Sequence, residues 1–239
     1  MKKLCFVLFL GLAACVFNTT APKGFKHREL QTSRFKLASW QKKTDETKPV
    51  RIYIEGDSSP FKDNSATYDT LIRDLAFNDP NANVVYLARP CQYVEEDDWC
   101  SPSDWGDGRF SKPIIDSMTE AVNQIARGRP VILIGYSESA MISGLMISRN
   151  PDMRVQKWIT IAGVLNHGNW TKHLKMRPLV NSLDLTVWPN VPQVHFVGGM
   201  DTIVPPTVVA SYAPNGTVLS IPQATHNTGF ETIYPLIYE

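Results

Sequence analysis

The sequence is nearly neutral and lacks the features that mark several classes of protein. Its 239 residues include 24 Lys and Arg against 23 Asp and Glu, a formal net charge of +1. No basic run is interleaved with aromatic residues, so binding to nucleic acid is not expected. Internal repeats and low-complexity tracts are missing as well. What remains is an ordinary globular composition, 43% hydrophobic and 20% charged, with enough chain for a single domain around one large core.

The apolar run near the N-terminus, Leu4–Leu12, is too short to span a bilayer comfortably. It follows two lysines and closes on small residues, a pattern typical of a secretory signal. The sequence LAAC that ends at Cys15 resembles the lipobox of bacterial lipoproteins, in which the cysteine is acylated. This resemblance implies a signal peptide of residues 1–14, a lipid anchor at Cys15 and, because Val16 follows, an outer-membrane location in the bacterial cell envelope, facing the periplasm. A plain secretory signal with an incidental cysteine is the alternative.

Cysteine is scarce, and the export prediction sorts the four that are present. Cys5 leaves with the signal and Cys15 carries lipid, which leaves Cys91 and Cys100 as a pair in an oxidising compartment. The segment between them is polar and acidic. A disulfide that closes this loop of about ten residues lowers the entropy of the unfolded chain and so stabilises the fold by roughly 2 to 3 kcal/mol. Two free thiols are the alternative, and zinc is disfavoured because no His or Cys pair stands nearby at ligand spacing.

Beyond the signal, the pattern predicts a flexible tether over residues 15–33 and one domain over 34–239. Two β-rich runs, 34–41 and 50–54, predict an antiparallel hairpin that feeds a sheet. Strands and helices then alternate, which predicts a mostly parallel sheet covered on both faces. The segment 164–192 has no clear period. The expected strands are 84–88, 131–134, 158–162, 194–198 and 218–221. Four helices are expected: one ends near residue 76, one ends near residue 128, and the other two cover 138–148 and 205–212.

The stretch VILIGYSESA, residues 131–140, predicts a buried strand that breaks into a sharp turn before a helix. In that context a serine stands above the carboxyl edge of the sheet and can act as a nucleophile. Because the serine adopts an uncommon backbone conformation, the positions two before and two after it need small side chains, here Gly135 and Ser139. Glycine is usual at the second position, and Ser139 departs from it by a CH2OH group. The alternative is a packing corner in which Ser137 has no chemical role.

A nucleophilic serine needs an imidazole to take its proton and a carboxylate to orient that imidazole. Asp201, in GGMDTIVPP, follows a predicted strand, and His226, in ATHNTGF, follows the last one. Both are expected at the sheet edge that Ser137 occupies, where open α/β sheets bind ligands. Asp201 also suits the N-cap of the next helix. Asp184 is the rival acid, and His195, in an apolar strand, is expected to be a core histidine.

GYSESA, GGMDTIVPP and ATHNTGF together resemble the α/β-hydrolase family over residues 34–239. The segment LARPCQYVEEDDWCSPSDWGDGRFS is also similar to a group of bacterial lipobox-bearing α/β-hydrolases, regarded as esterase lipoproteins. The resemblance implies a three-layer α/β fold with a mostly parallel central sheet, helices on both faces and an N-terminal antiparallel hairpin. It also implies that Ser137 is the nucleophile, His226 the general base and acid, and Asp201 the orienting carboxylate.

The reaction implied is hydrolysis of a small-molecule carboxylic ester or thioester through an acyl-serine, with no metal or organic cofactor. A peptidase or an acyltransferase would use the same triad. A lipoprotein that only binds an envelope component would keep the fold without needing the serine.

An oxyanion hole needs two preorganised N–H donors. The first is expected at Glu138, directly after the nucleophile. Where many family members have His-Gly after the third strand, this chain has EGDS, and the second donor is assigned to Asp57 because it follows the glycine. The negatively charged carboxylates of Glu55, Asp57 and Glu138 are poorly suited to stabilising an oxyanion. They are therefore expected to point away or to pair with cations, with Arg89 as a candidate partner.

Overall fold

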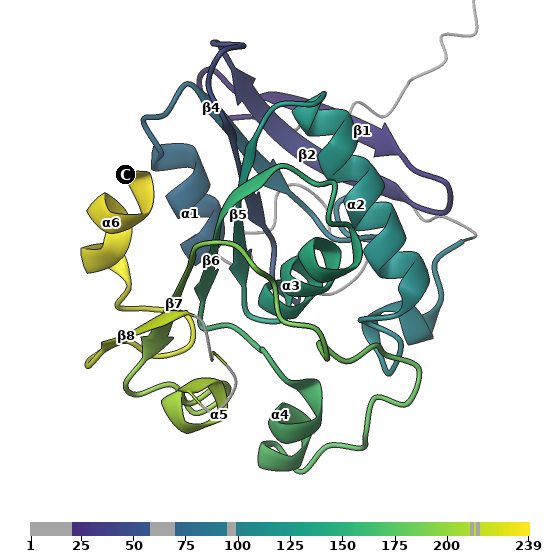
Figure 1. Cartoon of the computed structure of the whole chain (residues 1–239), viewed down its shortest axis with the longest axis vertical. Coiled ribbons are helices and arrows are strands. Elements are labelled where there is room, and N and C mark those ends of the chain that lie inside the picture. The colour runs from purple at the N-terminus through teal and green to yellow at the C-terminus, as the bar shows by residue number, and fades with distance from the viewer. Residues whose placement is uncertain (1–20, 58–69, 95–98, 211–212, 214–215) are drawn as a thin grey trace, which may run out of the picture.

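An eight-stranded sheet with the strand order β1-β2-β4-β3-β5-β6-β7-β8 forms the centre of the computed structural model (Figure 1). The structure describes residues 21–57, 70–94, 99–210, 213 and 216–239. β1 and β2 are antiparallel to each other, β2 is antiparallel to β4, and the remaining neighbours are parallel. The strands are β1 (Lys26–Gln31), β2 (Lys36–Lys43), β3 (Val50–Ile54), β4 (Asn83–Leu87), β5 (Val131–Tyr136), β6 (Val155–Ile161), β7 (Gln193–Gly198) and β8 (Thr217–Ile221). The helices are α1 (Thr70–Asn78), α2 (Lys112–Ala126), α3 (Ser139–Arg149), α4 (His167–His173), α5 (Pro206–Ala210) and α6 (Tyr234–Tyr238), with 3-10 turns η1 (Pro102–Trp105) and η2 (Glu231–Ile233).

The central strands are apolar on both sides because helices cover both faces of the sheet. Ile52 and Ile54 of β3 belong to a core shared with α2 and α3, whereas Tyr53 belongs to a core shared with α1 and α6. Figure 1 shows α2 and α3 in front of the sheet, with α1 and α6 beside each other away from them. This arrangement confirms the predicted three-layer architecture, and the short buried run 131–134 is a parallel strand, as its sequence predicts.

The N-terminal hairpin is present and both predicted strands exist, but the predicted pairing between them is wrong. The sequence predicts that β2 pairs with β3, whereas β2 pairs with β1, with Lys26 opposite Gln41, and with β4 on its other side. Residues 26–31, expected in the tether, are therefore part of the sheet. β1 has the sequence of a tether because its side chains are polar and largely exposed. The strand forms because an edge strand needs only backbone pairing with its neighbour, for which polar side chains suffice.

The predicted signal peptide and Cys15 lie outside the described residues. Among the residues that are described, no helix has the length and apolar character needed to cross a bilayer.

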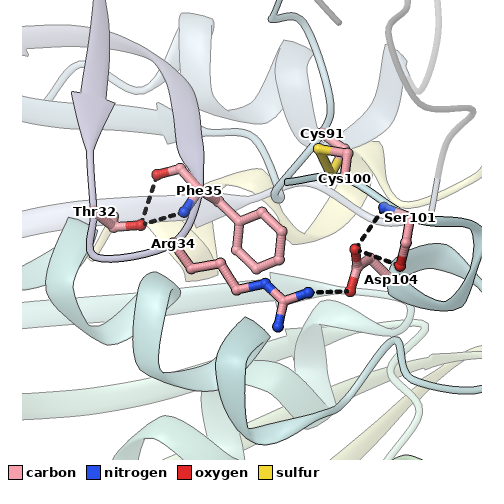
Figure 2. The surroundings of a disulfide bond; sticks show 7 residues. All are labelled: Thr32, Arg34, Phe35, Cys91, Cys100, Ser101 and Asp104. Atoms are coloured by element: carbon pink, nitrogen blue, oxygen red, sulfur yellow. Dashed lines mark hydrogen bonds and ion pairs between the residues drawn. A yellow bond between two sulfur atoms is a disulfide. The ribbon is translucent and has the colours of Figure 1, made fainter. Parts of the chain in front are cut away.

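A disulfide joins Cys91 and Cys100, as predicted, with 6.0 Å between the two Cα atoms. Figure 2 shows that it lies beside the turn that connects β1 and β2. In that turn the Thr32 hydroxyl donates to the Phe35 carbonyl, and Arg34 reaches across to Asp104 at 3.9 Å. The disulfide loop thus fixes the chain between β4 and η1, close to the carboxyl ends of the parallel strands.

A buried ion pair fastens the C-terminus to the sheet. The Arg51 Nε lies 2.7 Å from Asp79 Oδ2, both side chains are almost fully buried, and the Arg51 guanidinium also donates to the carbonyl of Ile237 in α6. The Tyr53 hydroxyl donates to the same Asp79 oxygen at 2.6 Å. Burial, followed by the negative charge of Asp79, raises the pKa of Tyr53 well above its ordinary value. The hydroxyl therefore stays protonated and remains a donor.

Replacing Asp79 with alanine is expected to lower the free energy of unfolding by about 3 to 5 kcal/mol, because it leaves the Arg51 guanidinium buried without its counter-ion. Urea denaturation followed by tryptophan fluorescence measures the change. The matched control is Asp152→Ala, which removes an exposed carboxylate and is expected to change stability by less than about 0.5 kcal/mol. Equal effects of the two substitutions would contradict a special role for the buried pair.

Candidate active site

Ser137 stands on a strained turn between β5 and α3. Its φ angle is +52°, in the left-handed region that residues with a side chain rarely adopt. Three backbone hydrogen bonds hold it there: its N–H donates to the Ile161 carbonyl at 3.0 Å, and its own carbonyl accepts from Ala140 at 3.1 Å and from Val164 at 3.0 Å. The turn is therefore fixed to the end of the neighbouring strand β6, and the serine is almost fully buried.

The small residues around this turn are needed for close backbone approach. A Cβ added at Gly135 would lie 2.5 Å from the Ser139 carbonyl oxygen. The departure from glycine at Ser139 has a local explanation, because its buried hydroxyl donates to the carbonyl of Glu55 at the end of β3. Serine at this position thus adds a bond between the turn and the adjacent strand at the same edge of the sheet.

His226 lies beside this serine, in the loop that follows β8. The distance from Ser137 Oγ to His226 Nε2 is 2.9 Å, within hydrogen-bond range. Its own backbone is positioned by Tyr136, whose hydroxyl is 3.0 Å from the His226 carbonyl and 2.6 Å from Asn227 Oδ1. The residue is about one-tenth exposed, so His226 is largely shielded from solvent but still reaches the surface.

Asp201 completes the chain of contacts and also caps its own loop. Its Oδ2 lies 2.8 Å from His226 Nδ1, and its Oδ1 accepts from the N–H groups of Ile203 and Val204, each at 2.8 Å. Burial alone would raise the pKa of Asp201, but the bonds from His226 and from the two backbone N–H groups outweigh it, so the pKa lies below its ordinary value. The carboxylate is therefore ionised and can only accept, which assigns a hydrogen to His226 Nδ1 and leaves Nε2 of the neutral imidazole with a lone pair.

The rival acid lies elsewhere. Asp184 Oδ1 is 2.8 Å from His167 Nε2, so Asp184 is paired with a different histidine. His195 is the core histidine expected from its strand: it is fully buried, and its Nδ1 lies 2.8 Å from Thr160 Oγ1. Burial lowers the pKa of His195 to about 4, so it stays neutral and structural.

Two of the three carboxylates expected to point away or to pair with cations, those of Asp57 and Glu138, lie against arginines. Asp57 lies 3.3 Å from Arg89 through Oδ1 and 3.3 Å from Arg109 through Oδ2. The same Arg109 Nη1 is 3.2 Å from Glu138 Oε1. Arg109 therefore bridges Asp57 and Glu138, because the side chains of both expected oxyanion residues contact the same guanidinium nitrogen.

Two features of the site are not predictable from the sequence pattern. The first is Arg109, in the segment DGRFS, because a lone arginine in a loop carries no signal of its partners. The second feature is the side chain of Glu138, whose Oε2 accepts from Ser137 Oγ at 2.7 Å. The sequence offers one signal that could have identified the arginine: the three carboxylates near the expected oxyanion site need cations. That signal points to Arg89 and gives no reason to choose Arg109.

The main-chain N–H of Glu138 belongs to the residue directly before α3. Amides at the start of a helix have no partner within the helix, and in the described part of the chain this N–H donates to no backbone oxygen outside it. No cluster of three or more His, Cys, Asp or Glu side chains that could hold a metal ion occurs among the described residues.

Comparison with known proteins gives a fold but no relative. No family model matches the sequence, and no curated protein matches it.

Solved structures are similar over most of the chain. An α/β serine hydrolase without lid from Xanthomonas campestris is 14% identical, with a TM-score of 0.60 over 90% of this chain and 93% of its own. An esterase from Pyrococcus furiosus is 13% identical, with a TM-score of 0.63 over 90% and 87%. An acylaminoacyl peptidase from Pyrococcus horikoshii is 10% identical, with a TM-score of 0.60 over 90% of this chain and 41% of its own. At these identities the likeness establishes the α/β-hydrolase fold alone.

Proposed function

We propose that this protein is a serine hydrolase that cleaves a carboxylic ester or thioester through an acyl-serine intermediate. The observation that carries the proposal is the continuous chain of contacts from Ser137 Oγ through His226, at 2.9 Å, to Asp201, at 2.8 Å. These three residues come from three separate loops, and nothing in the packing of the sheet requires a hydroxyl, an imidazole and a carboxylate to meet there. The similarity in fold to serine hydrolases and an esterase supports the same function.

In the first half of the proposed reaction, Ser137 Oγ forms a bond to the carbonyl carbon while its proton passes to His226 Nε2. The imidazolium then gives that proton to the leaving oxygen or sulfur as its bond to the acyl carbon breaks. Water repeats the sequence: it loses a proton to His226, its oxygen bonds to the acyl carbon, and the released Ser137 oxygen takes the proton back. Asp201 keeps His226 in the tautomer that can accept at Nε2.

The developing oxyanion would be held by the main-chain N–H of Glu138 and, as the second donor, by that of Asp57. The shared contact of their carboxylates with Arg109 supports this assignment, because it brings Asp57 to the same side of the sheet as the nucleophile. The guanidinium also offsets the two negative charges, which would otherwise oppose an oxyanion.

A fluorophosphonate probe tests the proposal without knowledge of the substrate, because it phosphonylates activated serines. Wild-type protein is expected to gain one probe mass at Ser137, located by peptide mass spectrometry, and Ser137→Ala is expected to gain none. A wild-type protein that stays unlabelled, or labelling that persists in Ser137→Ala, would refute the assignment.

A peptidase or acyltransferase would use the same three residues, and a peptidase is among the proteins of similar fold. Turnover of amide substrates, or capture of the acyl group by an added alcohol, distinguishes these reactions from ester hydrolysis.

For the cellular location we propose a lipid anchor at Cys15 and a place in the bacterial outer membrane facing the periplasm, on the strength of the lipobox pattern. The disulfide between Cys91 and Cys100 supports an oxidising compartment.

A further inference from the structure

The hydroxyl of Ser137 has two neighbours that compete for its single hydrogen. His226 Nε2 lies 2.9 Å from Oγ on one side, and Glu138 Oε2 lies 2.7 Å away on the other. The Nε2 of neutral His226 carries a lone pair, because Asp201 fixes the hydrogen on Nδ1. If Glu138 is ionised as well, both neighbours are acceptors and only one of them can receive the hydrogen.

Both short contacts are satisfied only when the group of Ser137, His226 and Glu138 holds one further proton. With that proton on His226 Nε2, the imidazolium donates to Oγ and the serine donates to the Glu138 carboxylate. With the proton on Glu138 instead, the carboxyl donates to Oγ and the serine donates to His226. The first arrangement is favoured because an imidazole is ordinarily a stronger base than a carboxylate. It leaves no base for the nucleophile, since the lone pair of Nε2 is occupied.

We propose that Glu138 is a proton-sensitive latch on the nucleophile. While the additional proton is bound, the Glu138 carboxylate accepts the hydroxyl hydrogen of Ser137, and when the proton leaves, Arg109 attracts the carboxylate away from the serine. This inference rests on the proposed function of Ser137 and His226. When the additional proton leaves to solvent, the Glu138 carboxylate withdraws to Arg109, the serine hydroxyl turns to His226, and the nucleophile becomes competent. Glu138 contacts the reacting oxygen itself, whereas Arg109 acts through Glu138 and is a positioning residue.

Arg109 is built to stay in place while the carboxylate moves. Its side chain is largely buried, its Nε donates to the Gly106 carbonyl at 2.8 Å, and its guanidinium lies 5.6 Å from the centre of the Trp170 ring. Its Nη1 already touches Glu138 Oε1 at 3.2 Å. A small rotation of the carboxylate therefore exchanges the contact with Ser137 for a fuller contact with the cation.

The charges around the latch set the direction of its pH response. Glu138 faces Arg109, and behind that cation lie Asp57 and Arg89. On the β3 side is the buried carboxyl of Glu55, whose residue is tied to α3 through its carbonyl. His226 faces Asp201. Among these groups a negative charge at Glu138 favours binding of the additional proton, and a positive charge at Arg109 opposes it.

Glu138→Gln is the decisive variant because it keeps the size of the side chain and removes its charge. A carboxamide can donate from its NH2 group to Ser137 Oγ while its oxygen accepts from Arg109, so that no additional proton is needed. We expect the pH at which labelling by an alkyl fluorophosphonate falls to half of its plateau to move down by about one unit. Glu46→Gln, the same change in an exposed turn, is the control and is expected to keep the wild-type midpoint.

Arg109 is expected to act in the opposite direction, and only through Glu138. In Arg109→Gln the half-rate pH should rise by about one unit, and in Arg109→Lys, which keeps the cation, it should return most of the way to the wild-type value. In the Glu138→Gln background, Arg109→Gln should move the midpoint little. A merely structural role for Arg109 predicts lower stability and a lower plateau in every background but no opposed shifts of the midpoint.

The outcomes separate the two proposals. A wild-type protein that does not react with the probe at any pH overturns the proposed function and the latch with it. A wild-type protein that reacts at Ser137, with the same midpoint in wild type and Glu138→Gln, overturns the latch and leaves the hydrolase intact. The isosteric Glu138→Gln distinguishes these outcomes even if Arg109→Gln fails to fold because it removes a largely buried cation from beside two carboxylates.

Discussion

Ser137→Ala is expected to lower kcat/KM for p-nitrophenyl acetate by about 10⁵-fold, and His226→Ala by a similar factor. The two side chains form one device, because the imidazole has nothing to activate without the hydroxyl and the hydroxyl is a poor nucleophile without the imidazole. The double variant should therefore be no slower than either single variant. Residual hydrolysis would come from binding and from the oxyanion donors, which the substitutions leave in place.

The loss cannot be assigned to misfolding if the variants retain the wild-type unfolding midpoint. Alanine at Ser137 has the same preference as serine against a φ of +52°, so the strain of the turn is unchanged. Ser220→Ala, at an exposed position of β8, provides the matched control and should keep full activity. Effects of Ser137→Ala and His226→Ala that multiply in the double variant would show that the two residues act independently, contrary to the contact at 2.9 Å.

Much of the fold is predictable because the central strands and the turns after them carry strong local signals. The run 131–134 is apolar throughout, and the following small residues have no better explanation than a tight turn between strand and helix. Ser137, Asp201 and His226 can be found for a related reason. Each follows a predicted strand, and parallel strands bring the loops after them to one edge of the sheet.

The edge of the sheet and the charged groups around the serine are not predictable in the same way. β1 is polar and basic because it lies at the edge, so its sequence resembles a tether, and only the pairing with β2 makes it a strand. The contacts of Arg109 depend on how the loop before α2 folds over the turn at Ser137. Such long-range ion pairs leave no periodic trace in a sequence, unlike an apolar face.

The two aspartates considered for the acid position can be separated by experiment. Asp201→Asn is expected to lower kcat/KM for p-nitrophenyl acetate by about 10⁴-fold. The structure supplies a specific reason: the Asp201 Oδ1 position accepts from the N–H groups of Ile203 and Val204, so an asparagine must place its oxygen there. Its NH2 group then faces His226 Nδ1 and drives the hydrogen to Nε2. That tautomer presents a donor to Ser137 where the reaction needs an acceptor.

Asp184→Asn is the matched control for this change. Its carboxylate is more than half exposed and lies against His167, so the same substitution there should change kcat/KM by less than about twofold. Because the pKa of Asp201 is held below its ordinary value, the carboxylate is ionised at neutral pH and takes up a proton only at a lower pH than a free aspartate does. The defect of Asp201→Asn should accordingly persist as a reduced rate across the neutral range. A large loss in Asp184→Asn together with an active Asp201→Asn would move the acid to Asp184 and require His167, not His226, to serve the nucleophile.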